Sequence, residues 1–124
     1  MTPDRGLDWG LIERRLRALL PERAVVAKRQ ELLSYDCDGL TLHRHEPRLV
    51  VLPDTAEQIA AVVRCCNELG VPFIARGSGT GLSGGALAEQ DAVVIATSRM
   101  RRVLEIDLAN ERITVQPGVI NSWV

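Results

Sequence analysis

Residues 49–85 read LVVLPDTAEQIAAVVRCCNELGVPFIARGSGTGLSGG, and the organisation of the chain follows from them. Four apolar residues at 49–52 lie between Pro47 and Pro53, which is typical of a short strand buried on both faces. A second apolar run follows at residues 73–75, and the stretch between the two runs has helical spacing. A strand, an amphipathic helix and a second strand in this order predict a βαβ unit with parallel strands.

The helix between the two strands has a recognisable beginning and end. Asp54 is predicted as its N-cap, with Glu57 three residues later as in a capping box. Gly70 is predicted as a left-handed C-cap, and Pro72 prevents the helix from continuing. One apolar stripe is expected to pack against the core, formed by Ile59, Val62, Val63, Cys66 and Leu69.

A glycine-rich run follows the second strand. Five of the ten glycines lie within residues 77–85, at the carboxyl end of a parallel strand, where such sheets bind ligands. Glycine adopts positive φ easily and has no side chain, so consecutive backbone N–H groups can surround a phosphate. Hydroxyl groups within the run and the charge of Arg76 at its entrance suit the same anion.

The run has other interpretations, and most of them fit poorly. A flexible surface loop is one, but apolar strands bracket this run closely. A Rossmann fingerprint requires a helix after the glycines, and residues 86–91 are too few for that helix. A P-loop requires a Gly-Lys-Ser/Thr ending, which is missing. The run therefore indicates a nucleotide diphosphate held by backbone amides without a Rossmann helix.

Elements are also expected on both sides of this unit. Asp8 is predicted to cap a helix with apolar residues at Ile12, Leu16, Leu19 and Leu20, and Pro21 ends it. A second helix is expected over residues 22–33, and a turn over residues 34–39. A third buried strand is expected at residues 92–97. Alternating residues at 104–108 and 113–116 then predict a hairpin with one face in solvent.

Composition disfavours several classes of protein. Fifteen Lys and Arg against sixteen Asp and Glu give a net charge of −1, so nothing favours binding to nucleic acid. Residues 1–10 lack the features of a signal peptide, and no apolar run approaches the roughly 18 residues of a membrane span. The odd set of three cysteines (Cys37, Cys65 and Cys66) is typical of a reduced, cytoplasmic protein.

Four stretches together resemble a known family. Residues 72–85 resemble the FAD-binding loop of the vanillyl-alcohol-oxidase (PCMH-type) flavoproteins, and residues 35–40, 50–55 and 115–119 agree with it. Within that family the chain is most similar to glycolate oxidase D subunits and FAD-linked D-lactate dehydrogenases. The resemblance implies an α+β fold, with N-terminal helices, a βαβ unit and a β-hairpin. Residues 1–33 would be an N-terminal helical segment, and residues 34–124 an FAD-binding domain incomplete at its C-terminus.

The resemblance also implies a cofactor site. In the family the glycine run wraps the FAD pyrophosphate, and the prolines after the first strand and the hairpin line the same cleft. The residues implied here are Pro53, Arg76, Gly77, Ser78, Gly79, Thr80, Gly81, Leu82, Ser83, Gly84, Gly85, Pro117 and Gly118. No catalytic residue is assigned, because the family's substrate-binding residues come after the point where this sequence stops.

The implied activity is oxidation of a 2-hydroxy acid, glycolate or D-lactate, to the 2-oxo acid by hydride transfer to FAD. Implied partners are subunits that include an iron–sulfur protein, with a cytoplasmic location that is peripheral at the inner face of the membrane. A non-catalytic nucleotide-binding module and an inactive truncated fragment are the alternatives. No metal site is predicted, because His43, His45 and Glu46 supply too few ligands. Trp9, Tyr35 and Trp123 are expected to anchor packing.

We expect Gly79→Val to abolish flavin retention in the complete enzyme that the resemblance implies. A β-branched side chain cannot take positive φ or tolerate a phosphate at contact distance. The flavin content of the purified variant, measured by absorbance after denaturation, tests this. A normal flavin content would contradict the assignment of the loop.

Overall fold

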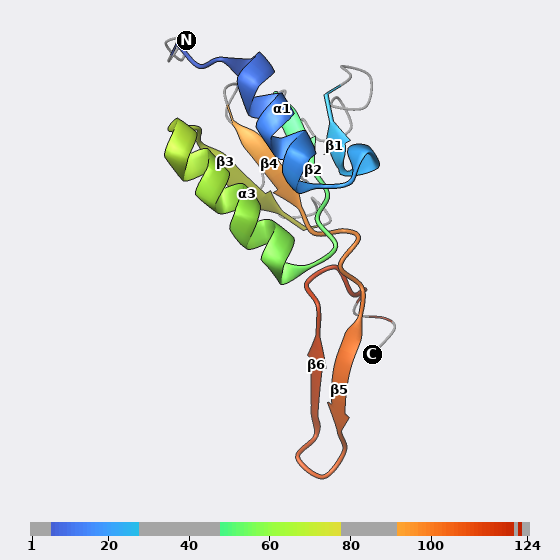
Figure 1. The fold of residues 1–124 in the computed structure, drawn as a ribbon. Coiled ribbons are helices and arrows are strands. Elements are labelled where there is room, and N and C mark those ends of the chain that lie inside the picture. The colour runs from blue at the N-terminus through green and yellow to red at the C-terminus, as the bar shows by residue number, and fades with distance from the viewer. Residues whose placement is uncertain (1–5, 28–47, 78–91, 121, 123–124) are drawn as a thin grey trace, which may run out of the picture.

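The computed structural model describes residues 6–27, 48–77, 92–120 and 122, and it confirms the α+β class. Within these residues the chain forms two α-helices, a short 3₁₀ helix and six strands. Figure 1 shows how they are arranged. In chain order they are α1 (Trp9–Leu19), η1 (Glu22–Ala24), β1 (Val25–Val26), β2 (Leu49–Val51), α3 (Ala56–Leu69), β3 (Phe73–Arg76), β4 (Val93–Ala96), β5 (Val103–Asp107) and β6 (Arg112–Val115). Neither α1 nor α3 is long and apolar enough to cross a membrane.

The main sheet has four strands in the order β1-β2-β4-β3. Strand β4 pairs in parallel with both neighbours, so that Val94 lies opposite Val50 on one side and Ile74 on the other. Strand β1 adds an antiparallel edge through Val25 and Val26. The predicted βαβ strands β2 and β3 are therefore parallel, and β4 lies between them.

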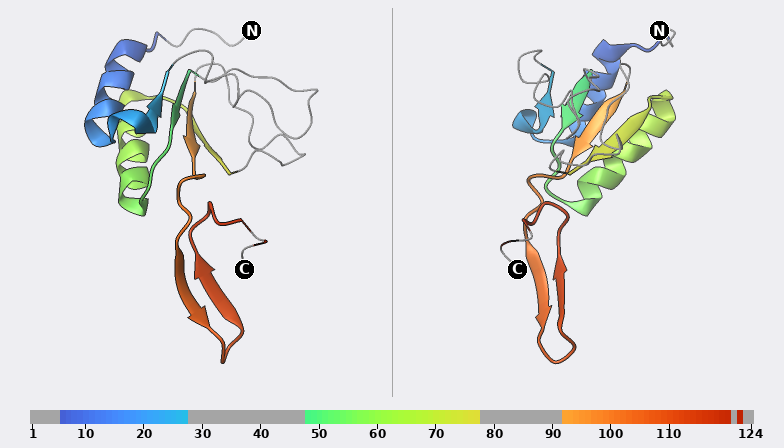
Figure 2. Two further views of the ribbon diagram at one scale, coloured as in Figure 1. Left: turned by 90° about the vertical axis from the view of Figure 1, so that its right-hand side faces the viewer. Right: turned by 180° about the vertical axis from the view of Figure 1, so that it is seen from behind.

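Both helices cover the same face of the sheet, as Figure 2 shows. The alternation of the strands divides the buried side chains into two clusters. Leu49, Val51, Val93 and Ile95 pack with the helices, whereas Val50, Leu52, Val94 and Ala96 form a second cluster on the opposite face. Val50, Val93 and Val94 are fully buried, and each stabilises the fold by roughly 1.5–3 kcal/mol.

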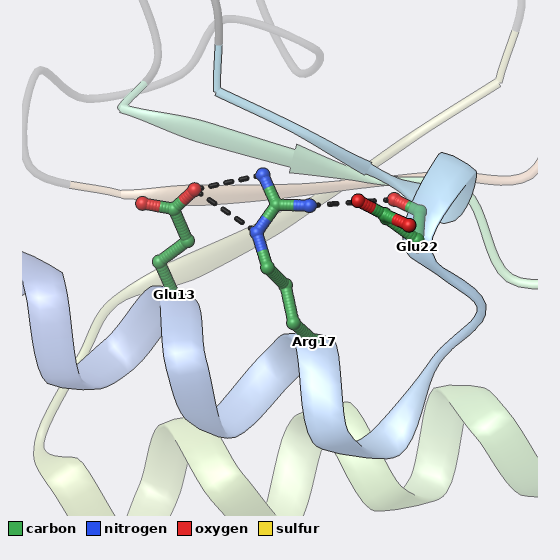
Figure 3. A network of polar contacts seen from close by, with 3 residues as sticks. All are labelled: Glu13, Arg17 and Glu22. Carbon is green, nitrogen blue, oxygen red and sulfur yellow. Dashed lines mark hydrogen bonds and ion pairs between the residues drawn. The ribbon is translucent and has the colours of Figure 1, made fainter.

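Helix α1 begins as predicted. The Asp8 carboxylate accepts a hydrogen bond from the backbone N–H of Leu11 at 3.1 Å. At the other end Arg17 lies between two glutamates: its Nη2 is 2.8 Å from the Glu13 carboxylate, and its Nη1 donates to the backbone carbonyl of Glu22 at 3.4 Å (Figure 3). These contacts link the end of α1 to η1 and so fix the path of the chain. Because they are partly exposed, they add little to the free energy of unfolding.

Trp9 anchors packing, as expected from the sequence. Trp9 is the first residue of α1, and its half-buried side chain packs against the hydrophobic core. The Arg48 guanidinium lies 5.4 Å from the centroid of its ring, within the range of a cation–π contact. This contact joins the start of α1 to the residue that precedes β2.

The second helix predicted over residues 22–33 is wrong where the structure describes it. Only Glu22–Ala24 is helical, and Val25–Val26 forms β1. The β-branched pair gains partners from β2, and the backbone N–H of Leu52 donates to the carbonyl of Ala24 at 2.8 Å. Residues 28–47, and with them the predicted turn at 34–39, lie outside the described residues.

Helix α3 confirms the predicted apolar stripe and C-cap, but it begins one residue later than expected. Thr55, not Asp54, is the N-cap, because its backbone is extended and its hydroxyl accepts from the N–H of Gln58 at 3.2 Å. The Gln58 side chain in turn accepts from the N–H of Asp54 at 2.7 Å. Gly70 adopts φ +67°, the left-handed conformation that the sequence indicated.

Strands β5 and β6 form the predicted antiparallel hairpin, which projects from the main sheet in both views of Figure 2. Ile106 lies opposite Ile113 on one face, while Glu105 and Asp107 occupy the other. The prediction of a single solvated face is wrong, because Ile106 remains 64% exposed and its apolar face is open as well. A hairpin of two short strands buries little apolar surface between its own side chains.

Two adjacent cysteines of α3 are buried. Cys66 was expected in the core, but Cys65 is buried too, because α1 packs across that side of the helix. Burial raises the pKa of both thiols, and that of Cys66 rises to about 11. Both side chains therefore behave as small apolar groups.

We expect Cys65 and Cys66 to resist iodoacetamide at pH 8 in the folded protein and to react fully after denaturation. With a pKa near 11, only about one Cys66 thiol in a thousand is ionised at that pH. The ionised fraction increases as the pH rises toward the pKa. Peptide mass spectrometry measures the labelling at each site, and rapid native labelling of Cys66 would contradict its burial.

Candidate cofactor-binding site

The carboxyl ends of β2, β3 and β4 lie at one edge of the main sheet because these strands are parallel. Strand β3 ends at Arg76 and passes directly to Gly77. After β4, Thr97 donates its backbone N–H to the carbonyl of Arg76 at 3.0 Å, and its hydroxyl lies 3.3 Å from the same oxygen. The start of the glycine run is therefore fixed beside the end of β4.

Pro53 and Arg76, two of the predicted cofactor-binding residues, are buried. Pro53 is fully buried after β2, and Arg76 is 9% exposed at the end of β3. Neither lines the cavity at this edge that is described below. Pro53 follows the end of β2 by two residues, and Arg76 is the last residue of β3, so both lie near the carboxyl ends of parallel strands. Residues 78–85 of the predicted site lie outside the described residues.

The chain that leaves the hairpin returns to the end of β4. Two hydrogen bonds between Arg102 and Gln116, both 2.9 Å, hold the base of the hairpin together. Gly118 then donates its N–H to the carbonyl of Met100 at 2.7 Å, and Met100 donates to the carbonyl of Thr97 at 2.9 Å. The turn after β4 is thus held from both sides.

Gly118 has a structural reason to be glycine. A Cβ at this position would lie 2.3 Å from the carbonyl oxygen of Thr97 and 2.7 Å from that of Met100. Both atoms belong to the backbone and cannot rotate away. The sequence predicted only a cofactor-lining role for Gly118, because this contact between distant segments leaves no local signal.

A cavity of about 470 Å³ opens at this point, which is within the usual range for small-molecule sites. It brings together three predicted residues from distant parts of the sequence, Gly77, Pro117 and Gly118. The described lining residues are Gly77, Ser98, Arg101, Pro117, Gly118, Val119 and Ile120. Ser98 and Arg101 were missed, although their place just after a parallel strand is a signal that could have found them.

The lining suits an anion that is joined to an apolar group. Arg101 provides a cation and Ser98 a hydroxyl, and none of the described lining residues carries a carboxylate. Val119 and Ile120 add apolar surface. The chemistry of these groups fits one part of a dinucleotide, with the phosphate near Gly77 and Arg101.

A second cavity, of about 420 Å³, lies on the polar face of the hairpin and has the opposite charge. Its lining includes Glu105, Asp107 and Glu111. Hydrogen bonds from the Asn110 side chain and backbone hold the pKa of Asp107 below its usual value. These bonds belong to the hairpin turn, so the turn itself accounts for Asp107. Among the described residues, no group of three or more His, Cys, Asp or Glu side chains is arranged so that it could hold a metal ion. His43 and His45 are not among those residues.

Comparison with known proteins identifies related sequences and structures. The family model described as "FAD binding domain" matches residues 47–123. Glycolate oxidase subunit GlcD from Escherichia coli K12 is 42% identical over 106 residues, which cover 86% of this chain and 21% of that protein. D-lactate dehydrogenase from Archaeoglobus fulgidus is 39% identical over 71 residues, covering 57% of this chain and 16% of that protein.

A solved structure is also similar to this chain. The crystal structure of p-cresol methylhydroxylase with substrate bound matches with a TM-score of 0.77 and 26% identity, over 96% of this chain and 24% of that one. The chain spans about a fifth of the length of the curated relatives it matches.

We expect Gly118→Ala to lower the free energy of unfolding by about 1–3 kcal/mol, because the new methyl group overlaps backbone carbonyls. Gly77→Ala is the matched control: it makes the same change in the same cavity, but its Cβ would meet no atom of the described residues within 4 Å. The control should change stability by less than about 0.5 kcal/mol. Urea denaturation measures both, and equal stabilities would contradict the close approach at Gly118.

Proposed function

Because the chain belongs to the family of FAD binding domains, we propose that it holds the diphosphate of FAD in a flavoprotein oxidoreductase. One observation carries this proposal. The family match extends over both the glycine run and the segment after the hairpin, and the structure gathers Gly77, Pro117 and Gly118 around one cavity.

The chain's own residues have separate tasks in this proposal. Gly77 begins the run through Gly85 whose backbone amides would hold the diphosphate. Pro117 and Gly118 form another part of the lining, and Pro53 and Arg76, near the carboxyl ends of β2 and β3, are proposed to bind the cofactor as well. Bound FAD would supply the redox chemistry by accepting a hydride, and the task of this part of the protein is to hold and orient the cofactor.

We propose a 2-hydroxy acid as the substrate of the complete polypeptide. Two relatives are named glycolate oxidase subunit and D-lactate dehydrogenase, and both acids carry a hydroxyl group next to a carboxylate. Assembly with partner subunits is part of the proposal, since one relative is named as a subunit. An iron–sulfur protein is the partner we propose, and the complex would lie in the cytoplasm, peripheral at the inner face of the membrane.

The complete natural polypeptide that contains residues 1–124 provides the test. We expect it to purify with FAD, identified by chromatography of the cofactor released on denaturation. Anaerobic addition of glycolate or D-lactate should bleach the visible absorbance of the oxidised flavin, and a non-hydroxylated acid such as acetate serves as the control.

Each outcome of this test has a clear meaning. Absence of bound FAD, or failure of added FAD to bind, would overturn the whole proposal. Bound FAD that no 2-hydroxy acid reduces would overturn the proposed substrate class.

A further inference from the structure

Three arginines lie in the turn between β4 and β5, and one of them differs from the others. Arg99, Arg101 and Arg102 are close in sequence, but among them only Arg101 lines the cavity beside Gly77. Within the described part of the chain, no carboxylate forms an ion pair with Arg101. The cavity therefore has a cation that no described carboxylate neutralises.

The position of this cation is fixed by the fold. The Nε of Arg101 donates a hydrogen bond of 2.7 Å to the carbonyl of Ser98, which orients the planar guanidinium. The same turn is held by the bond from Met100 to Thr97 and by the bond from Gly118 to Met100. A guanidinium has five N–H donors, so those on its terminal nitrogens remain for a ligand.

We propose that Arg101 is a cofactor-binding residue that contacts the diphosphate of FAD through its terminal N–H groups. The inference rests on the proposed function and extends it to a residue outside the glycine run. Its basis is the cavity that Arg101 shares with Gly77, where the diphosphate-binding run begins. Guanidinium groups bind phosphate oxygens with two parallel hydrogen bonds, and the absence of a carboxylate among the described lining residues leaves the charge available.

The diphosphate fits better than the carboxylate of a substrate. Arg101 and Gly77 contribute to the same cavity, and a dinucleotide has two linked phosphates that can contact both. ADP therefore serves as a probe, because it carries the diphosphate without the flavin ring. A contact to the diphosphate predicts that FAD and ADP lose affinity together when Arg101 is changed.

The experiment uses the complete polypeptide, freed of its cofactor, and calorimetric titration with FAD and with ADP at two salt concentrations. Arg101→Gln should weaken both ligands by about tenfold, with a smaller dependence of affinity on salt. Arg101→Lys should recover part of the loss. Arg102→Gln is the matched control, since it removes the same charge from an exposed neighbour that does not line the cavity. It should change affinity by less than about twofold.

Several results would overturn the inference. Equal affinities in Arg101→Gln and Arg102→Gln would show that Arg101 makes no special contact, while normal FAD binding by the unchanged protein would leave the proposed function intact. A lower melting temperature of cofactor-free Arg101→Gln, with no recovery in Arg101→Lys, would assign Arg101 a purely structural role. Failure of the unchanged protein to bind FAD would instead overturn the proposed function.

Discussion

The pairing of β4 with strands on both sides is the constraint on which the described structure depends. All four residues of β4 are buried, and β4 pairs with β2 and with β3 as parallel strands. Because the three strands run the same way, the segments that follow them must leave from one edge. Gly77 and Ser98 approach each other for this reason, although the glycine run and the β4–β5 turn are separate in the sequence.

A second contact completes the edge. The hairpin is solvated on both faces and is attached at its base, where Gly118 approaches the turn after β4 so closely that no side chain fits. Glycine thus has two uses in this site. In the run that starts at Gly77 it would, under the proposed function, free backbone amides for a ligand, whereas at Gly118 it allows one backbone to contact another.

The parts that could be predicted are those with a local cause. The strands 49–51, 73–76 and 93–96, the stripe of α3 and the cap at Gly70 all follow from short sequence patterns. Strand β1 could not be predicted, because its conformation depends on pairing with β2 across a long separation. The burial of Cys65 arises only when α1 packs against α3, whereas Ser98 and Arg101 could have been found from their place just after a parallel strand. Choosing Asp54 over Thr55 as a cap failed because both residue types cap helices.

The charge of the chain shows why composition alone says little about anion binding. A net charge of −1 argues against a polyanion such as nucleic acid, yet single arginines can still serve one phosphate pair. Several arginines are neutralised locally, as in the ion pairs of Arg15 with Glu68 and Arg112 with Asp107. Carboxylates gather at the polar face of the hairpin, and none lies among the described residues that line the cavity at the sheet edge. Because the fold separates charge between these two cavities, a nearly neutral chain has a cavity at the sheet edge that is lined by the cation of Arg101 and, among the described residues, by no carboxylate.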